Sequence, residues 1–493
     1  MRKFLSVLLS ASLVLSSLVM FASAVGAESK FKITEDPAIA ASVKAYVDIK
    51  QALKDKKPLT EIKATYESVF QADVKRLDAA IKVEDPKIDE NITFILDGAI
   101  EGKLEYLQAN EAIQKGILWY YYFFIRDLMS KSVKVSMTSG DTAAAKVQFD
   151  KVVQVYENVF LASATSRDTQ FKTTMVENLK ASIELVQKDI ADSNLKDFNI
   201  HRQILDKTLM KFFALATYNY AGKLPTVPVA DIQYEMTEAY LLFMPIYSYF
   251  KVGSPADAEY VKEVFGSGDI TKVDKTKLGL AIQRMMIGKV SEYLTGAITK
   301  LDAKDLEGAR GTAMEGIMFV STQEVFLGPE KYAAVSVVAE KFREAIDNSN
   351  AAEARKLSQE ITAYLVGTDG LKLTINSTLY QVDGVDFTAA AAPYVNYLTN
   401  RTLVPVRLIS DALLADVSYD VATKTVKIVK DGKTTELKVG SDQVIQDGKV
   451  SETVKLDQPV LIKNNSSFIP LRAIVELFGK KVFFNNGEIN VLR

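Results

Sequence analysis

Residues 404–409 (VPVRLI) and 469–474 (IPLRAI) are two versions of one stretch, and they decide how the last quarter of the chain is organised. The second follows the first by 65 positions, and the correspondence continues on both sides of the motif. A duplication this regular predicts a unit built from two copies of one module in tandem. The copies are expected to span about residues 371–430 and 434–493.

Short strands are expected in both copies. Apolar and polar residues alternate at 371–375, which is the period of a strand with one buried face. The pairs Asp431-Gly432 and Asn486-Gly487 are typical of tight hairpin turns. One short helix per copy is expected directly after the duplicated motif, at about 408–414 and 473–478.

Two prolines and two arginines of the motif occupy equivalent positions in the copies. Pro405 and Pro470 have no amide hydrogen, so each is expected at a strand end or a sheet edge. Arg407 and Arg472 are interpreted as packing or ion-pair residues, because duplication of a structural role explains their equivalence better than two ligand sites do. All four are therefore predicted to be structural.

The residues around the first motif resemble a known family. Residues 400–407 (NRTLVPVR), a following helix, and residues 417–420 (VSYD) and 425–428 (TVKI) are similar to the copper amine oxidase N-terminal-like domain, a stalk domain common in secreted proteins of Firmicutes. The resemblance covers about residues 371–493. It implies a spacer or attachment role and no oxidase activity, since in the oxidases this domain is a stalk remote from the active site.

The region before this unit, residues 28–367, is predicted to be helical. No proline occurs between Pro86 and Pro225, and apolar residues recur at three- and four-residue spacing, which is typical of helices with one buried face. Asp141 and Asp305 mark expected helix boundaries.

A repeat of 90 residues is indicated inside the helical region. The stretch at 66–72 (YESVFQA) recurs in similar form at 156–162 (YENVFLA). An aspartate follows each copy at the same spacing, Asp78 after the first and Asp168 after the second. This pattern favours an array of helical hairpins or small bundles that bury their aromatic side chains against neighbours. The predicted fold is therefore a long all-α repeat or bundle region followed by a tandem α+β module of hairpins, each copy with one short helix.

The first 27 residues are predicted to be a secretory signal. Arg2 and Lys3 precede an apolar stretch at 4–21 that ends in small residues, which is the layout of a cleaved signal. Cleavage is expected after Ala27, with Ala24 as the alternative, and an uncleaved anchor is the less favoured reading. The protein is therefore expected to be secreted and cell-wall associated, with no membrane contact beyond the signal.

Composition argues against several classes of function. The 493 residues are 48% hydrophobic with a formal net charge of −2 and no cysteine, which is unlike a disordered chain or a nucleic-acid-binding protein. The one histidine, His201, is interpreted as a partly exposed helix residue. Because zinc, haem and Ser-His-Asp sites need more imidazole or thiol groups, we predict no catalytic residue, no cofactor and no metal site.

An aromatic run is the first candidate for a binding surface. Trp119, Tyr120, Tyr121 and Tyr122 lie in the most hydrophobic part of the chain. They are interpreted either as a helix buried on nearly all sides or as an aromatic groove that docks a partner or a glycan.

Two acids are the second candidate. Glu101 and Glu315 stand in apolar surroundings. Each is interpreted either as a helix-edge acid paired with a lysine or an arginine, or as a tuned carboxylate or a ligand of a hard cation.

Three functions are compatible with these observations. The favoured one is a secreted, cell-envelope-associated, non-enzymatic protein, whose helical region binds or assembles and whose stalk module is a spacer or a wall-association unit. Its expected partner is a cell-wall polymer or another envelope protein. The second is an extracytoplasmic binding protein that holds a metal ion or a small ligand through carboxylates of the helical region. The third is a cell-wall or polysaccharide hydrolase with an appended stalk module.

Overall fold

The computed structural model describes residues 31–366, 370–382, 385–408, 415–430, 432–464, 466–478, 480–485 and 487–492. The predicted signal sequence lies outside these residues, as does nearly all of the helix expected at 408–414. The chain divides into two compact units, Met1–Ala351 and Ala352–Arg493. An all-helical region at 37–366 is followed by a strand-rich region, which confirms the predicted class of fold.

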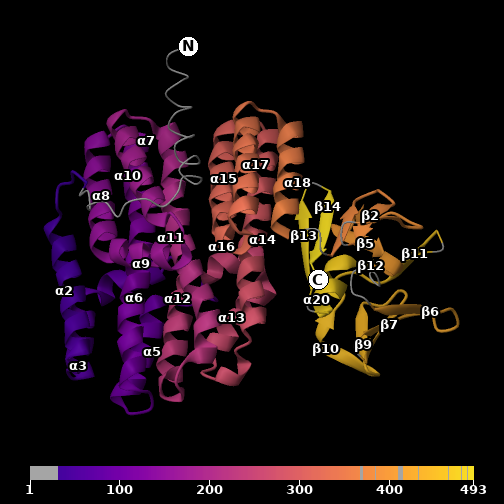
Figure 1. Cartoon of the computed structure of the whole chain (residues 1–493), viewed down its shortest axis with the longest axis horizontal. Coiled ribbons are helices and arrows are strands. Elements are labelled where there is room, and N and C mark those ends of the chain that lie inside the picture. The colour runs from indigo at the N-terminus through magenta and orange to yellow at the C-terminus, as the bar shows by residue number, and fades with distance from the viewer. Residues whose placement is uncertain are drawn as a thin grey trace. The chain divides into compact units, whose positions relative to one another are not determined.

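Helices make up the first unit (Figure 1). Neighbours joined by short connections pack side by side, as α10 does with α11 and α14 with α15, and this is the expected geometry of helical hairpins. The α-helices are α2 (Pro37–Lys54), α3 (Leu59–Val69), α4 (Gln71–Asp78), α5 (Ile88–Ile100), α6 (Tyr106–Asp127), α7 (Lys134–Ser139), α8 (Thr142–Val155), α9 (Leu161–Phe171), α10 (Met175–Ala191), α11 (Leu195–Lys223), α12 (Ile232–Gly253), α13 (Pro255–Gly266), α14 (Lys275–Asp302), α15 (Leu306–Val320), α16 (Glu324–Leu327) and α17 (Pro329–Asp347).

Short turns of other helix types lie between these helices. Two are π-helical, η1 (Leu128–Val133) and η2 (Tyr156–Phe160), and four are 3-10 turns, η3 (Leu224–Thr226), η4 (Val229–Asp231), η5 (Ile270–Lys272) and η6 (Ser321–Gln323). A further helix, α18 (Ala351–Val366), begins at the boundary of the second unit. Of the helices that the structure describes, none has both the length and the hydropathy needed to cross a bilayer.

Aspartates begin several helices of this unit. Asp141 accepts a hydrogen bond from the amide of Ala144 at the start of α8, and Asp305 accepts one from Gly308 at the start of α15. Such caps satisfy amide groups that have no partner inside the helix. The boundaries predicted at both aspartates are confirmed.

The two aspartates of the 90-residue repeat have equivalent roles in the structure. Asp78 accepts hydrogen bonds from the first two amides of α5, both 2.8 Å long. Asp168 accepts hydrogen bonds from the first two amides of α10, also 2.8 Å long. Each aspartate therefore ties the end of one helical segment to the start of a later helix.

A close crossing of α12 and α14 shapes the centre of the unit. A Cβ atom on Gly288 would lie 2.2 Å from the carbonyl oxygen of Gly253, so a side chain at this position is sterically excluded. The crossing brings the end of α12 against the middle of α14, and α14 packs along α15.

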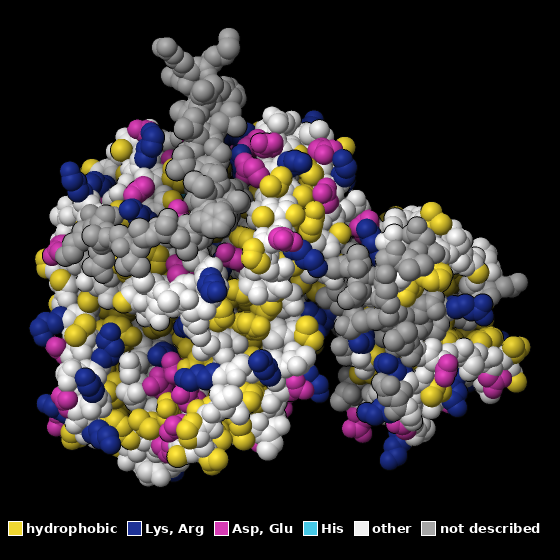
Figure 2. Space-filling view, viewed as in Figure 1, with side chains coloured by type: hydrophobic (Ala, Val, Ile, Leu, Met, Phe, Trp, Pro, Cys, Tyr) yellow, Lys and Arg dark blue, Asp and Glu magenta, His cyan; other side chains and the backbone are white. Residues whose placement is uncertain are grey.

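Charges of both signs are mixed on the face seen in Figure 2. Lysine and arginine side chains alternate with aspartate and glutamate over the described part of this face.

The second unit is built from strands in three antiparallel sheets. Its strands are β1 (Leu371–Thr374), β2 (Leu379–Val382), β3 (Val385–Thr388), β4 (Tyr394–Asn396), β5 (Arg401–Pro405), β6 (Asp416–Asp420), β7 (Thr425–Lys430), β8 (Lys433–Lys438), β9 (Gln443–Gln446), β10 (Lys449–Lys455), β11 (Leu461–Lys463), β12 (Ser466–Pro470), β13 (Lys481–Asn485) and β14 (Glu488–Leu492), and α20 (Leu471–Leu477) follows β12.

Each sheet of this unit takes strands from both halves of the duplicated sequence. The five-stranded sheets run β13-β14-β1-β2-β3 and β10-β9-β8-β7-β6, and the four-stranded sheet runs β11-β12-β5-β4. In both five-stranded sheets, the last two strands of one half pair with the first three strands of the other half. The hydrophobic core is likewise one cluster that includes Val404, Ile428, Ile469 and Ile489.

The two copies of the motif pair with each other at the centre of the four-stranded sheet. Val404 lies opposite Ile469, Pro405 opposite Phe468, and Leu403 opposite Pro470. Because Val404 and Ile469 are equivalent in the duplication, the pairing is symmetric about them. The duplicated stretch thus contacts its own counterpart.

The expectation of two consecutive copies in tandem is not confirmed. Strand exchange between the halves leaves neither half with a complete sheet of its own. The hairpins predicted at Asp431-Gly432 and Asn486-Gly487 are present as antiparallel pairs, β7 with β8 and β13 with β14. The second predicted short helix is α20.

The aspartate caps can be tested by substitution. Asp168→Ala removes two cap hydrogen bonds and a third bond from the Thr173 hydroxyl. We expect it to lower the free energy of unfolding by about 1–2 kcal/mol, measured by urea denaturation followed by circular dichroism. Asp231→Ala is the matched control, since Asp231 precedes α12 without a side-chain cap bond, and its effect should stay within about 0.5 kcal/mol. Equal effects of the two variants would contradict the assigned role.

Strand exchange in the second unit can be tested by truncation. A chain that ends at Lys430 lacks β8–β14, so β1, β5 and β7 each lose a partner strand. Because three unpaired strand edges are left, we expect residues 371–430 to be cleaved at protease levels that the full unit resists. A chain ending at Ala351 is the control, and its helical unit should survive like that of the longer chains. A protease-resistant, monomeric 371–430 segment would show that one half folds alone.

Candidate functional site

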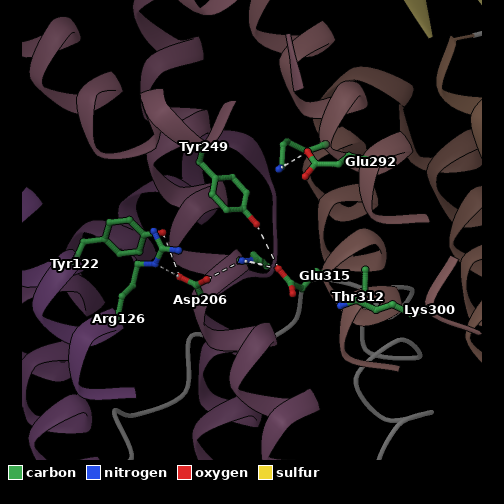
Figure 3. Close-up of polar contacts among 10 residues, drawn as sticks. Tyr122, Arg126, Asp206, Tyr249, Glu292, Lys300, Thr312 and Glu315 are labelled. Carbon is green, nitrogen blue, oxygen red and sulfur yellow. Dashed lines mark hydrogen bonds and ion pairs between the residues drawn. The ribbon is translucent and has the colours of Figure 1, made fainter. Parts of the chain in front are cut away.

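A chain of partly buried ion pairs joins three helices of the first unit. It consists of Arg126 on α6, Asp206 and Lys207 on α11, and Glu315 on α15, and we call these four residues the charge chain (Figure 3). Positive and negative side chains alternate along it, so the chain is neutral as a whole.

Its geometry is tight. The Nε atom of Arg126 lies 3.1 Å from Oδ1 of Asp206. The Nζ atom of Lys207 lies 2.8 Å from Oδ2 of Asp206 and 3.0 Å from Oε2 of Glu315. The Lys207 side chain is only 3% exposed, so its ammonium depends on these two carboxylates.

Aromatic rings enclose the charge chain. The hydroxyl of Tyr122 donates to Asp206 (3.2 Å), and that of Tyr249 donates to Glu315 (3.3 Å). The Phe319 ring is stacked on the rings of Tyr249 and Tyr293, with centroids 5.8 Å apart in both pairs. These rings exclude water and offer their faces to the cations, as Tyr249 does to Lys207 at 4.7 Å.

A second buried lysine also contacts this aromatic stack. Lys289 on α14 is 4.1 Å from the centroid of Tyr249 and 2.5 Å from Oε2 of Glu292. Burial lowers the pKa of Lys289, and the bond to Glu292 opposes this shift. The crossing at Gly288 places Lys289 directly next to the closest contact of α12 and α14.

The electrostatics of the charge chain favour its ionised form. Burial by itself would raise the pKa of Asp206, but Arg126 and Lys207 outweigh burial and hold this pKa at about 2. The pKa of Arg126 is raised, because the attraction of Asp206 outweighs the cost of burial. A carboxylate with so low a pKa is a poor general acid or base near neutral pH, so the arrangement is suited to holding charge and not to transferring protons.

A cavity of about 260 Å³ adjoins the charge chain. Its charged lining consists of Arg126, Asp127, Arg202 and Asp206, and its apolar lining includes Leu77, Ile81, Phe123, Met129 and Leu205. The walls come from α4 and the turn after it, α6, η1 and α11.

The aromatic run does not form a surface groove. Trp119, Tyr120, Tyr121 and Tyr122 are at most 6% exposed, so the hypothesis of an exposed docking surface does not hold for these side chains. Their position on α6 explains this, because α6 packs between α5 and α12 and is buried on nearly all sides. The hydroxyls of Tyr120, Tyr121 and Tyr122 bind Asp73, the Ser42 hydroxyl and Asp206, respectively.

Both candidate acids are paired with lysines. Glu101 is half exposed at the end of α5 and lies 2.6 Å from Lys103. Glu315 is largely buried and belongs to the charge chain. The structure does not bring the two acids together, so they do not form one site.

The single histidine is paired as well. His201 Nδ1 lies 2.7 Å from Oδ2 of Asp189, and its side chain is 13% exposed. Among the described residues, no group of three or more histidine and acidic side chains is placed to hold a metal ion.

The two prolines of the duplicated motif lie at strand ends. Pro405 and Pro470 are the last residues of β5 and β12, as their missing amide hydrogens require. Arg407 and Arg472 are both exposed, and the guanidinium of Arg472 lies over the ring of Phe484 at 5.3 Å.

Sequence reasoning missed most of the charge chain and the cavity. Arg126 interrupts the strongly apolar run at 117–129, and Asp206 and Lys207 stand directly before the mostly apolar stretch at 208–216, and this is the signal that could have found them. A charged residue in such a stretch is buried with the helix and must find a partner there.

The role of Asp206 can be tested across pH. Asp206→Asn leaves Lys207 and Arg126 without this counter-ion, so we expect a loss of about 3 kcal/mol in the free energy of unfolding at neutral pH. Because the pKa of Asp206 is lowered from 3.8 to about 2 in the folded state, its stabilisation is complete above the unfolded-state value and is lost as pH falls. The difference between wild type and variant should therefore shrink by about 2 kcal/mol between about pH 4 and pH 2.

Urea denaturation at several pH values measures this difference. Glu101→Gln is the control, since its exposed pair with Lys103 should contribute no more than about 0.5 kcal/mol at any pH. A pH-independent gap between wild type and Asp206→Asn would refute the ionised, stabilising role of this carboxylate.

Comparison with known proteins identifies the second unit only. No curated protein and no solved structure matches the chain. Residues 358–492 match the family model described as copper amine oxidase N-terminal domain, so the resemblance predicted from residue 371 onward is confirmed and extends back into α18. The helical region is unmatched, and the matched domain is non-catalytic in the oxidases. Residues 358–492 are therefore similar to the copper amine oxidase N-terminal domain.

Proposed function

We propose that this is a secreted, cell-envelope-associated protein without catalytic activity, in which the helical unit binds a ligand or partner and the C-terminal unit is a spacer or wall-association unit. The observation that carries the proposal is the charge chain. Its acidic and basic side chains are all ion-paired with one another beside the cavity. Side chains paired in this way can keep a fixed geometry, but they are poorly suited to proton transfer.

The cavity favours a small ligand over a metal ion. Arg126 is paired with Asp206, but Arg202, which also lines the cavity, is in no ion pair among the described residues, and its guanidinium repels a cation while it attracts an anion. The version of the binding hypothesis in which carboxylates hold a metal is therefore the weaker one. A shift of the melting temperature with Ca²⁺ or Fe³⁺ would revive it.

The carboxylates of the cavity also argue against a hydrolase. A glycosidase needs one free acid and one free carboxylate that flank the substrate. Asp127 binds Arg76 and Lys131, each at 2.8 Å, and Asp206 binds Arg126 and Lys207. Since neither acid is free of counter-ions, the non-enzymatic reading is the better supported one.

Fractionation of producing cells tests export and attachment separately. We expect the full chain in the wall fraction and a chain without residues 371–493 in the medium, measured by immunoblotting. A chain without residues 1–27 is the control for export and should stay inside the cells. Equal release of the full and shortened chains would refute the attachment role, and export without residues 1–27 would refute the signal.

A further inference from the structure

One arginine of the cavity has no counter-ion. Arg202 lines the cavity, and its Nε–H group is buried without a hydrogen-bond acceptor among the described residues. Among the residues that the structure describes, no carboxylate lies within ion-pair distance of the Arg202 guanidinium. An unsatisfied buried donor of this kind destabilises a folded protein.

The other charges of the cavity are already matched. Asp127 is held by Arg76 and Lys131, and Asp206 is held by Arg126 and Lys207. Arg202 is therefore the charge left over, and the cavity has room for one further negative charge.

The pKa of Arg202 agrees with this account. Burial lowers it, and the positive charge of Arg126 acts in the same direction, while Asp206 and Glu315 oppose the shift from a distance. A bound anion would reverse the effect by supplying the missing counter-charge.

We infer that this cavity is a binding site for a small organic monoanion, namely a carboxylate that carries a short apolar chain or ring. The inference rests on the proposed function, in which the helical unit binds a ligand. A carboxylate matches the planar fork of a guanidinium with two parallel hydrogen bonds. The apolar part contacts Leu77, Ile81, Phe123, Met129 and Leu205, which line the remainder of the cavity.

Charge and size favour a monocarboxylate over a phosphate ester. A single uncompensated cation is neutralised by a single negative charge, whereas a phosphate monoester carries nearly two at neutral pH. The volume of about 260 Å³ lies just below the usual range of ligand pockets, which suits a small molecule with one charged end.

Calorimetric titration of the full chain without its signal tests the inference. The probes are hexanoate, hexan-1-ol and hexyl phosphate at one ionic strength, so that charge varies while the apolar chain stays constant. We expect saturable binding of hexanoate and weaker binding of both other probes. Hexanol binding as tight as hexanoate would overturn the role of charge, tighter hexyl phosphate would overturn the monoanion, and no saturable hexanoate binding would overturn the site.

Two arginine variants give a matched comparison. Arg202→Gln should weaken hexanoate binding about tenfold or more, because it removes the charge-assisted hydrogen bonds. Arg167→Gln is the control, since the Nε atom of Arg167 is also buried without a partner, but its guanidinium lies over Phe212 and away from the cavity. Equal hexanoate affinity of wild type and Arg202→Gln, or an equal loss in Arg167→Gln, would overturn the assignment.

A third variant and a stability measurement show whether a loss of hexanoate binding comes from misfolding of the variant. Arg202→Lys keeps the charge without the planar fork and should bind hexanoate with intermediate affinity. Without ligand, Arg202→Gln should melt no lower than wild type, because it removes a partly buried cation whose Nε–H group has no acceptor among the described residues. A lower melting temperature would mean that Arg202 serves the fold, which contradicts the inference.

The proposed function can be refuted independently of the monoanion site. It fails if the full chain stays inside cells or distributes like the chain without residues 371–493, whatever the calorimetry gives. If fractionation succeeds and hexanoate does not bind, only the monoanion site is lost.

Discussion

The helical unit is organised around the burial of Lys207. An ammonium group that is 3% exposed needs both of its carboxylate partners, so α11 must stay in contact with α15, which carries Glu315. The Tyr249 ring adds α12 to this arrangement, because it faces both Lys207 and Lys289. The absence of side chains at Gly253 and Gly288 then allows α12 and α14 to approach closely enough. One buried charge thereby fixes the relative positions of four helices.

The second unit meets an equivalent constraint with its backbone. A strand edge without a partner leaves amide and carbonyl groups unsatisfied, and β1, β5 and β7 of the first half each have one partner strand in the second half. Each half therefore completes the sheets of the other, and β14 at the end of the chain pairs with β1 at the start of the unit. The two motifs meet in the middle, at Val404 and Ile469.

The sequence was most informative where local signals decide structure. Helix starts at Asp141 and Asp305, the hairpins of the second unit, and the strand ends at Pro405 and Pro470 all depend on a few neighbouring residues, and all were predictable. Strand exchange was not, because a duplicated sequence is equally consistent with two separate copies and with two interleaved ones. The aromatic run was ambiguous for a related reason, since Trp119 and its neighbours fit a buried helix as well as a groove. The charge chain joins residues from 126 to 315, and no local pattern reveals which buried charges will meet.

Arg202 and Lys207 lie on the same helix, five residues apart, and the contrast between them separates structure from function. Lys207 forms ion pairs with two carboxylates and contacts aromatic rings, so the contacts that it makes explain its burial. Arg202 is partly buried, and its Nε–H group has no acceptor among the described residues, so this donor contributes no hydrogen bond to the fold. Stability alone would favour an uncharged side chain at this position. A cation that the fold does not need, at the wall of a cavity, is therefore best explained by something that enters the cavity.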